Sequence, residues 1–504
     1  MSSKHPVQTI PRKAVRRVPN PLQAPLLHTK ELPSGANCYI IPKKGYASVQ
    51  CMVCVRYGAM DMAFTANGRR RDTPAGAAHF LEHKLFESAA GQPSVFEIFA
   101  RQGADVNAFT TAACTAYYFT AASYIQENLR VLLDFVYNLH LTDENVEKEK
   151  GIITQEIRMY DDDPQWAAHF GLLETAYAVN PSRMNIAGTA ESVELLTKEI
   201  LEDCYNVFYR PHNMAIVCAG DFESYGLDDE ALYDLIDKSI PRNCGLWTGS
   251  NERHFGAPPT RTHGRAAERF VLCDQPGTHG RAAERFVLCD QPRPFMQDSG
   301  ARVQAQGKGV EVVRHYGDEP TTVSREFICK QMSVSRPIFN IGIKDDLAQR
   351  QKPKDIAATK LLLDMLCGES SVLYNGLFAK GLIGESFGAD YLTDASVGLS
   401  VFAGESAEPQ RVYEAILAEI VRMQAQGINH ADFDRLKRKH IGQFIQGLNS
   451  LEAIAAAQCA YFVKQTDLPR MLYAYQALTA EDISARLADF GGEGQTALSV
   501  VEGK

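Results

Sequence analysis

The stretch AGAAHFLEHKLFES, residues 75–88, places two histidines and a glutamate close together in a segment that favours a helix. Successive residues of an α-helix turn by about 100°. Glu82 follows His79 by three residues and His83 follows it by four, so the three side chains project from one face. Two imidazoles at this spacing can share one metal ion, and imidazole nitrogen suits zinc. The stretch therefore predicts a metal-binding helix on which Glu82 can take a proton from a metal-bound water.

A pattern of the form H-x-x-E-H needs a second observation, because composition alone would produce it in roughly two of a hundred chains of this size. A catalytic zinc also takes a third protein ligand and leaves one position open for water. In ENVEKEKGIITQEIRMY, residues 144–160, Glu149 and Glu156 lie on an apolar stripe at helical spacing. Two glutamates in a buried stripe are costly unless they are paired or bound to a cation. Glu87, one turn beyond His83, is a weaker candidate because it would have to bend back toward the histidines.

The bulk properties of the chain restrict the classes of function. Its 504 residues suggest two or three domains, and the net charge of −9 argues against a general nucleic-acid binder. No apolar run approaches the length needed to span a bilayer. Most of the twelve cysteines lie among apolar residues, which is typical of reduced core cysteines and predicts a cytoplasmic protein.

The organisation along the chain predicts two α/β halves joined by a linker. Residues 1–32 are expected to form a disordered basic tail, 33–245 a first domain, 246–325 a linker and 326–504 a second domain. The linker contains THGRAAERFVLCDQP twice, at 262–276 and 278–292, which indicates a tandem duplication or a sequence error without a function. Segment 66–77 favours a loop, 105–124 a hairpin, and 408–426 and 430–464 long helices.

HFLEHKLFE followed by EKEKGIITQEI resembles the pitrilysin or insulinase family of zinc metallopeptidases, the inverzincins. GADVNAFTTAACTAYYF resembles the edge-strand segment of that family. The similarity is strong over about 36–222 and weaker over about 326–504, and it is greatest to a bacterial subgroup of processing-protease-like members in which a lysine follows the histidine pair. The resemblance implies an α+β fold of two related α/β-roll domains. Each would have a mostly antiparallel sheet with helices packed on one face, in a clamshell-like arrangement.

The resemblance also implies roles for particular residues. His79, His83 and Glu156 would bind one zinc ion per chain, Glu82 would be the general base, and Glu149 would be an acid that helps to organise the site. Asn107 and Ala108 would contact the backbone of an extended peptide substrate through strand-edge hydrogen bonds. An internal hairpin without a free edge is the alternative for their segment.

The chain departs from the family pattern in its second half. Many members carry an arginine and a tyrosine that grip the substrate, where KGLIGES has Lys380 and Gly384. The resemblance therefore implies a zinc endopeptidase that acts on peptides or unfolded segments and needs a homologous partner subunit, as a heterodimer or homodimer. The alternative is a non-catalytic subunit that binds metal and peptide. Peptide cleavage that a chelator abolishes and zinc restores would distinguish the two.

Overall fold

The computed structural model describes residues 27–89, 91–241, 312–345, 352–394 and 396–504. Most of the expected tail and the whole duplicated segment lie outside these residues. The structure corrects the expectation in two places, because the end of the expected tail and part of the expected linker form strands. His28–Glu31 forms strand β1, and Val312–Arg314, inside the expected linker, forms strand β9. Each is held by antiparallel pairing, β1 with β2 and β9 with β4, which composition alone did not reveal.

The first half contains a six-stranded sheet in the order β1-β2-β8-β3-β7-β6. Its further strands are β2 (Asn37–Pro42), β3 (Val49–Val55), β6 (Ala104–Thr110), β7 (Thr115–Ala121) and β8 (Met214–Gly220). The β2–β8 pair is parallel and the other pairs are antiparallel. The expected hairpin at 105–124 is confirmed as β6 and β7, and β6 lies at the edge of the sheet.

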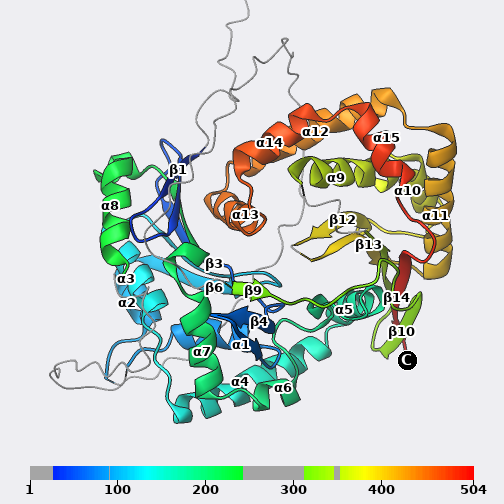
Figure 1. The fold of residues 1–504 in the computed structure, drawn as a ribbon. Helices are drawn as coiled ribbons and strands as arrows, with labels where there is room; N and C mark the ends of the chain where they lie inside the picture. Colours follow the sequence, from blue (N-terminus) through cyan, green and yellow to red (C-terminus); the bar gives the residue numbers. More distant parts are fainter. Residues whose placement is uncertain (1–26, 90, 242–311, 346–351, 395) are drawn as a thin grey trace, which may run out of the picture. The chain divides into compact units, whose positions relative to one another are not determined.

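Helices cover one face of this sheet (Figure 1). They include α1 (Ala77–Leu85), α2 (Val95–Arg101), α3 (Ile125–Tyr137), α4 (Asp143–Asp161), α6 (Ala190–Glu194), α7 (Lys198–Phe208) and α8 (Asp229–Ser239). Phe80 and Leu81 of α1, Leu132 of α3 and Ile153 of α4 are buried in the core on this face. The apolar stripe expected on α4 therefore faces the core, and it places α4 beside α1.

The segment expected as a loop at 66–77 is wrong in its first part. Strands β4 (Ala63–Ala66) and β5 (Arg69–Asp72) form a hairpin, with positive φ at both Asn67 and Gly68. A two-residue Asn-Gly connection with this geometry matches the twist of the flanking strands. The run of arginines suggested a loop, whereas the Asn-Gly pair was the informative signal.

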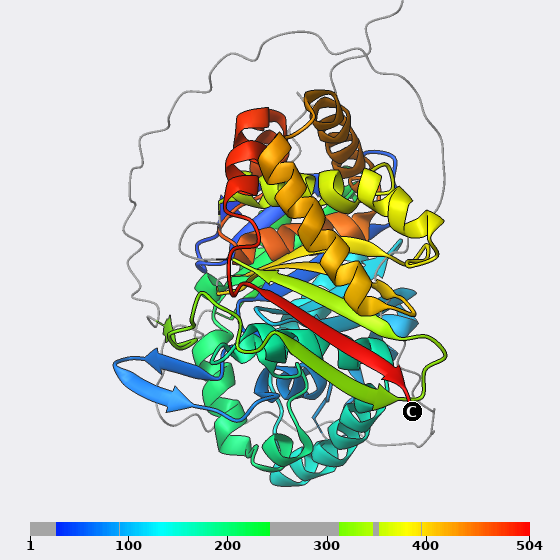
Figure 2. The same ribbon diagram turned by 90° about the vertical axis from the view of Figure 1, so that its right-hand side faces the viewer.

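The second half repeats the architecture with a five-stranded sheet in the order β10-β14-β11-β13-β12 (Figure 2). The strands are β10 (Phe327–Met332), β11 (Ile338–Lys344), β12 (Gly388–Thr393), β13 (Gly398–Glu405) and β14 (Thr496–Gly503). The helices are α9 (Pro353–Cys367), α10 (Val372–Ala379), α11 (Pro409–Gln426), α12 (His430–Gly447), α13 (Leu451–Val463), α14 (Leu468–Ala477) and α15 (Ala480–Ala488). The single helix expected at 430–464 is wrong, because Ser450 caps a new helix by accepting the N–H of Ala453.

Each half contributes one helix that packs on the sheet of the other half. Helix α13 of the second half packs on the other face of the first sheet, where Ile454 and Cys459 are buried with Cys54 and Val217. Helix α5 (Pro164–Ala176) of the first half packs on the second sheet, where Leu172 is buried with Leu399. The expected α+β fold with two sheet-bearing halves is confirmed. The expectation of helices on one face is incomplete, because the second face of each sheet contacts a helix from the other half.

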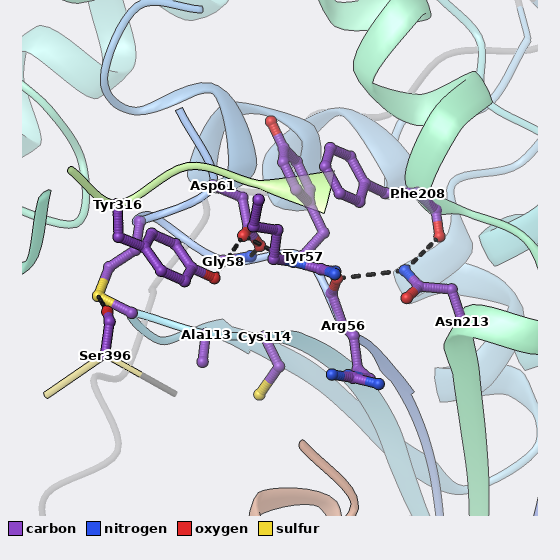
Figure 3. A network of polar contacts seen from close by, with 12 residues as sticks. Arg56, Tyr57, Gly58, Asp61, Ala113, Cys114, Phe208, Asn213, Tyr316 and Ser396 are labelled. Atoms are coloured by element: carbon purple, nitrogen blue, oxygen red, sulfur yellow. Dashed lines mark hydrogen bonds and ion pairs between the residues drawn. The ribbon is translucent and has the colours of Figure 1, made fainter. Parts of the chain in front are cut away.

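A buried polar network fixes the loop that follows β3 (Figure 3). The Asp61 carboxylate accepts hydrogen bonds from the Gly58 N–H at 3.0 Å, the Tyr316 hydroxyl at 3.0 Å and Arg314 Nε at 2.8 Å. Arg314 lies on β9, so the network attaches the segment that begins at residue 312 to the first half. A separate hydrogen bond, from the Thr115 hydroxyl to the Tyr57 carbonyl oxygen at 2.9 Å, holds the backbone just before Gly58.

Candidate metal centre and active site

Helix α1 begins at a glycine that no other residue replaces without strain. Gly76 has a φ of +91°, and a Cβ atom there would collide with the carbonyl oxygen of Ala187. This close approach places the first turn of α1 against the loop before α6. The predicted helix over the H-x-x-E-H pattern is confirmed, with His79, Glu82 and His83 inside it.

His79, His83 and Glu156 converge on one point. His79 Nε2 lies 3.6 Å from Glu156 Oε1, and His83 Nε2 lies 3.5 Å from Glu156 Oε2. Each of the three offers a ligand atom within 4.8 Å of the other two, and within the described ranges no other such group was found. Two imidazoles and one carboxylate are a donor set of catalytic zinc sites, so these residues fit that ion.

The other two glutamate candidates lie outside this group. Glu149 Oε1 is 3.0 Å from His83 Nδ1, the ring nitrogen on the opposite side from Glu156. Glu87 pairs with Lys84 Nζ. The three carboxylates therefore have different partners. Glu156 lies near the Nε2 atoms of both histidines, Glu149 contacts Nδ1 of His83, and Glu87 pairs with Lys84.

Glu82 points toward the edge strand. The Thr110 hydroxyl donates a hydrogen bond to Glu82 Oε2 at 2.5 Å, and it lies 3.3 Å from the Thr115 hydroxyl. Burial raises the pKa of Glu82 to about 7, although the Thr110 hydrogen bond and His83 act in the opposite direction. A carboxyl group with a pKa near neutrality can both accept and release a proton during turnover.

The electrostatics of the histidines differ. Burial and the neighbouring His83 lower the pKa of His79 to about 3, so His79 is neutral and able to bind a metal at neutral pH. Burial also opposes the charge on His83, but the hydrogen bond to Glu149 and the nearby carboxylates outweigh it and raise the pKa of His83. Burial opposes the charge on Glu149 too, yet the hydrogen bond and charge of His83 hold the pKa of Glu149 below its ordinary value.

Two residues beside the centre were not predicted as site residues. The Tyr160 hydroxyl donates to Glu156 Oε1 at 2.6 Å, and the Tyr160 ring stacks on Trp166 with centroids 4.8 Å apart. Thr110 contacts Glu82 as described above. Tyr160 lies four residues after Glu156 on the same helix face, which is a signal that the sequence contained. The contact of Thr110 crosses from a strand to a helix and has no such signal.

Asn107 and Ala108 lie on β6, opposite Tyr118 and Tyr117 of β7. Among the described strands β6 pairs only with β7, so its second edge is not used within the sheet. The Ala108 N–H donates to Asn107 Oδ1 at 2.8 Å. Lys380 and Gly384 lie after α10 in the second half.

Comparison with known proteins gives a consistent result. The family model described as "Insulinase (Peptidase family M16)" matches residues 64–190, and "Peptidase M16 inactive domain" matches residues 301–439. The "Uncharacterized zinc protease YmfH" of Bacillus subtilis is 32% identical over 467 residues, which cover 92% of this chain and 93% of that protein. This chain belongs to the M16 peptidase family.

Solved structures and a further relative agree with membership of the M16 family. An M16-like peptidase from Alicyclobacillus acidocaldarius superposes with a TM-score of 0.77 at 29% identity, covering 95% of this chain and 98% of that one. A protease from Helicobacter pylori has a TM-score of 0.69 at 16% identity, covers 95% and 100%, and shares the fold. The "Uncharacterized zinc protease YmxG" of Bacillus subtilis is 31% identical over 37% of this chain and 43% of its own length. The predicted family is confirmed, and the zinc bound by the M16 family agrees with the predicted cofactor.

Within the described part of this M16 chain, no helix has both the length and the apolar character needed to cross a bilayer.

Proposed function

We propose that this chain is a zinc endopeptidase that hydrolyses peptides or unfolded protein segments. The observation that carries the proposal is the convergence of His79, His83 and Glu156 beside a half-buried Glu82. These three residues would hold the zinc ion, which when bound lowers the pKa of water and polarises a carbonyl oxygen. Family membership and the names of the relatives support the same class of reaction.

The residues of the chain then divide the work of hydrolysis. Glu82 accepts a proton from the attacking water and passes it to the amine of the leaving peptide. Glu149 holds the ring of His83 through Nδ1 and so orients the other ring nitrogen. Asn107 and Ala108 of the edge strand align the substrate in an extended conformation by backbone hydrogen bonds.

A partner subunit completes this site in our proposal. Lys380 and Gly384 stand where many family members carry a substrate-gripping arginine and tyrosine. Loss of a donor to the tetrahedral oxyanion typically costs about a hundredfold or more in rate. A homologous subunit would supply these groups in a heterodimer. A mixture with that subunit should cleave peptides far faster than this chain alone, and equal rates would remove the need for a partner.

Cleavage of an unstructured peptide, measured with a chelator and after zinc is added back, tests the function. Loss and recovery of cleavage support the peptidase. Stoichiometric zinc and peptide binding without cleavage, even with the partner, would instead support a non-catalytic subunit. A natively prepared chain that takes up no zinc would overturn both.

We also infer a cytoplasmic location for the chain. The nine cysteines in the described residues are free thiols, and eight of them are buried. Thiols persist in this form in reducing compartments. Fractionation of the native cell, followed by detection of the chain, tests the inference.

A further inference from the structure

Lys84, the residue after His83, is a buried cation. Only 1% of its side chain is exposed. An ammonium group at such a depth is costly unless charged and polar partners surround it. Lys84 has three partners: the Glu87 carboxylate, the Asn145 carbonyl oxygen at 3.2 Å and Glu149 Oε2 at 3.4 Å.

The contact with Glu149 connects Lys84 to the candidate metal centre. Glu149 uses Oε2 toward Lys84 and Oε1 toward His83 Nδ1, so its two oxygens are assigned to two different groups. A carboxylate held at both oxygens cannot rotate away from the imidazole. The partner of one imidazole nitrogen sets the orientation and basicity of the other nitrogen as a metal ligand. Lys84 therefore acts on His83 through Glu149.

The charges around the centre lead to the same conclusion. Glu156 lies with the histidine nitrogens that would hold a divalent cation, whereas Glu87 and Glu149 contact Lys84. The ammonium group of Lys84, which contacts both Glu87 and Glu149, partly neutralises the negative charge of these two carboxylates, neither of which belongs to the candidate ligand group. Asn145 is on α4, so the same lysine also holds α4 against α1.

The chain contains a matched lysine that lacks this connection. Lys150 is also buried, with 9% of its side chain exposed, and it pairs with Glu147 at a spacing of three residues. It also donates to a backbone carbonyl, that of Glu194, at 3.0 Å. Lys84 and Lys150 thus share burial, a glutamate partner and a carbonyl partner, and they differ in the contact of Lys84 with Glu149.

We propose that Lys84 is a positioning residue of the metal centre, which holds Glu149 against His83 and thereby raises the metal affinity of the site. The proposal rests on the proposed function in assuming that His79, His83 and Glu156 bind zinc. Nothing in the role of Lys84 requires that the bound ion performs catalysis.

The test compares zinc affinity in the full-length chain, Lys84→Met and Lys150→Met by competition with a chromophoric chelator. Lys84→Met should weaken zinc binding about tenfold, the lower end of the effect of losing an outer partner such as Glu149, because Lys84 contacts the ligand only through Glu149. Lys150→Met should leave the affinity unchanged, although both variants should melt at a lower temperature. The absorption spectrum of bound Co²⁺ should change in Lys84→Met and not in Lys150→Met. Equal zinc affinity and equal Co²⁺ spectra in Lys84→Met and the unaltered chain would overturn the proposal.

A double-mutant cycle tests whether Lys84 acts through Glu149. If it does, Lys84→Met combined with Glu149→Gln should bind zinc no more weakly than Glu149→Gln alone. Additive losses would overturn the proposed path. If Lys84→Met fails to fold, Lys84→Gln, which keeps a hydrogen-bond donor, replaces it in every comparison. Failure of the unaltered chain to bind zinc would refute the proposed function instead, so the two failures are distinguishable.

Discussion

The Thr110 hydroxyl lies 2.5 Å from Glu82 Oε2 and donates a hydrogen bond to it. Thr110 is the last residue of the edge strand β6, and Glu82 lies on α1 between the two histidines. The contact therefore connects the strand proposed to hold the substrate with the residue proposed to move the proton. A peptide paired with β6 would be delivered beside Glu82, and the predictions below separate the roles of these neighbouring groups.

Glu82→Gln should keep zinc and lose cleavage. The amide cannot accept the proton of the attacking water, and the loss of a general base typically costs about a hundred- to ten-thousandfold in rate. The side chain does not belong to the group of three that would hold the ion. Zinc content by elemental analysis and kcat on a fluorogenic peptide measure the two effects. Loss of zinc from this variant would show that Glu82 has a different role.

Glu156→Gln should weaken zinc binding directly. Glu156 presents its two oxygens to the Nε2 atoms of His79 and His83, and an amide is a poorer ligand than a carboxylate. The loss of zinc affinity should exceed the roughly ten- to hundredfold loss that is typical when a residue supporting a metal ligand is replaced. Chelator competition gives the zinc affinity, with Glu149→Gln as the comparison. A larger loss in Glu149→Gln than in Glu156→Gln would return the ligand role to Glu149.

The contribution of Glu82 to the stability of the zinc-free protein should fall as the pH rises from about 4.5 to about 7. Burial raises the pKa of Glu82 from 4.5 to about 7, so the folded protein binds this proton more tightly than the unfolded chain. Across this window the unfolded state releases the proton first, and the folded state loses up to about 3 kcal/mol from this group. Urea unfolding at several pH values measures the free energy of unfolding. The stability of the unaltered protein relative to Glu82→Gln should fall across the window, and identical pH profiles would contradict the prediction.

Asn107→Ala should raise KM without changing zinc affinity. Asn107 lies on the edge strand and its Oδ1 accepts the Ala108 N–H, so its amide lies where a substrate backbone would pair. Loss of one hydrogen bond to substrate corresponds to roughly a two- to tenfold change. Asp105→Ala, an exposed change two residues earlier on the same strand, is the matched control. An equal rise of KM in both variants would argue against a particular role for Asn107.

The sequence predicted most of the elements that local periodicity specifies. Helix α1, the β6–β7 hairpin and the stripe on α4 follow from repeats of about 3.6 or two residues along the chain. The prediction failed where a short local signal was overlooked, as at the Asn67-Gly68 turn and the Ser450 cap. The sequence did not predict that α5 packs on the second sheet and α13 on the first, because packing between distant segments leaves no periodic pattern.

By itself, the sequence determined that His79, Glu82 and His83 share a helix face and that Glu149 and Glu156 share another, since helical spacing is a local property. Only the tertiary structure decided which glutamate approaches both Nε2 atoms and which one contacts Nδ1 of His83. Those assignments depend on how α1 and α4 pack together. Glu149 and Glu156 are seven residues apart on α4, so a shift of about two turns between the helices, roughly 10.5 Å, would exchange the glutamates without altering either helix pattern.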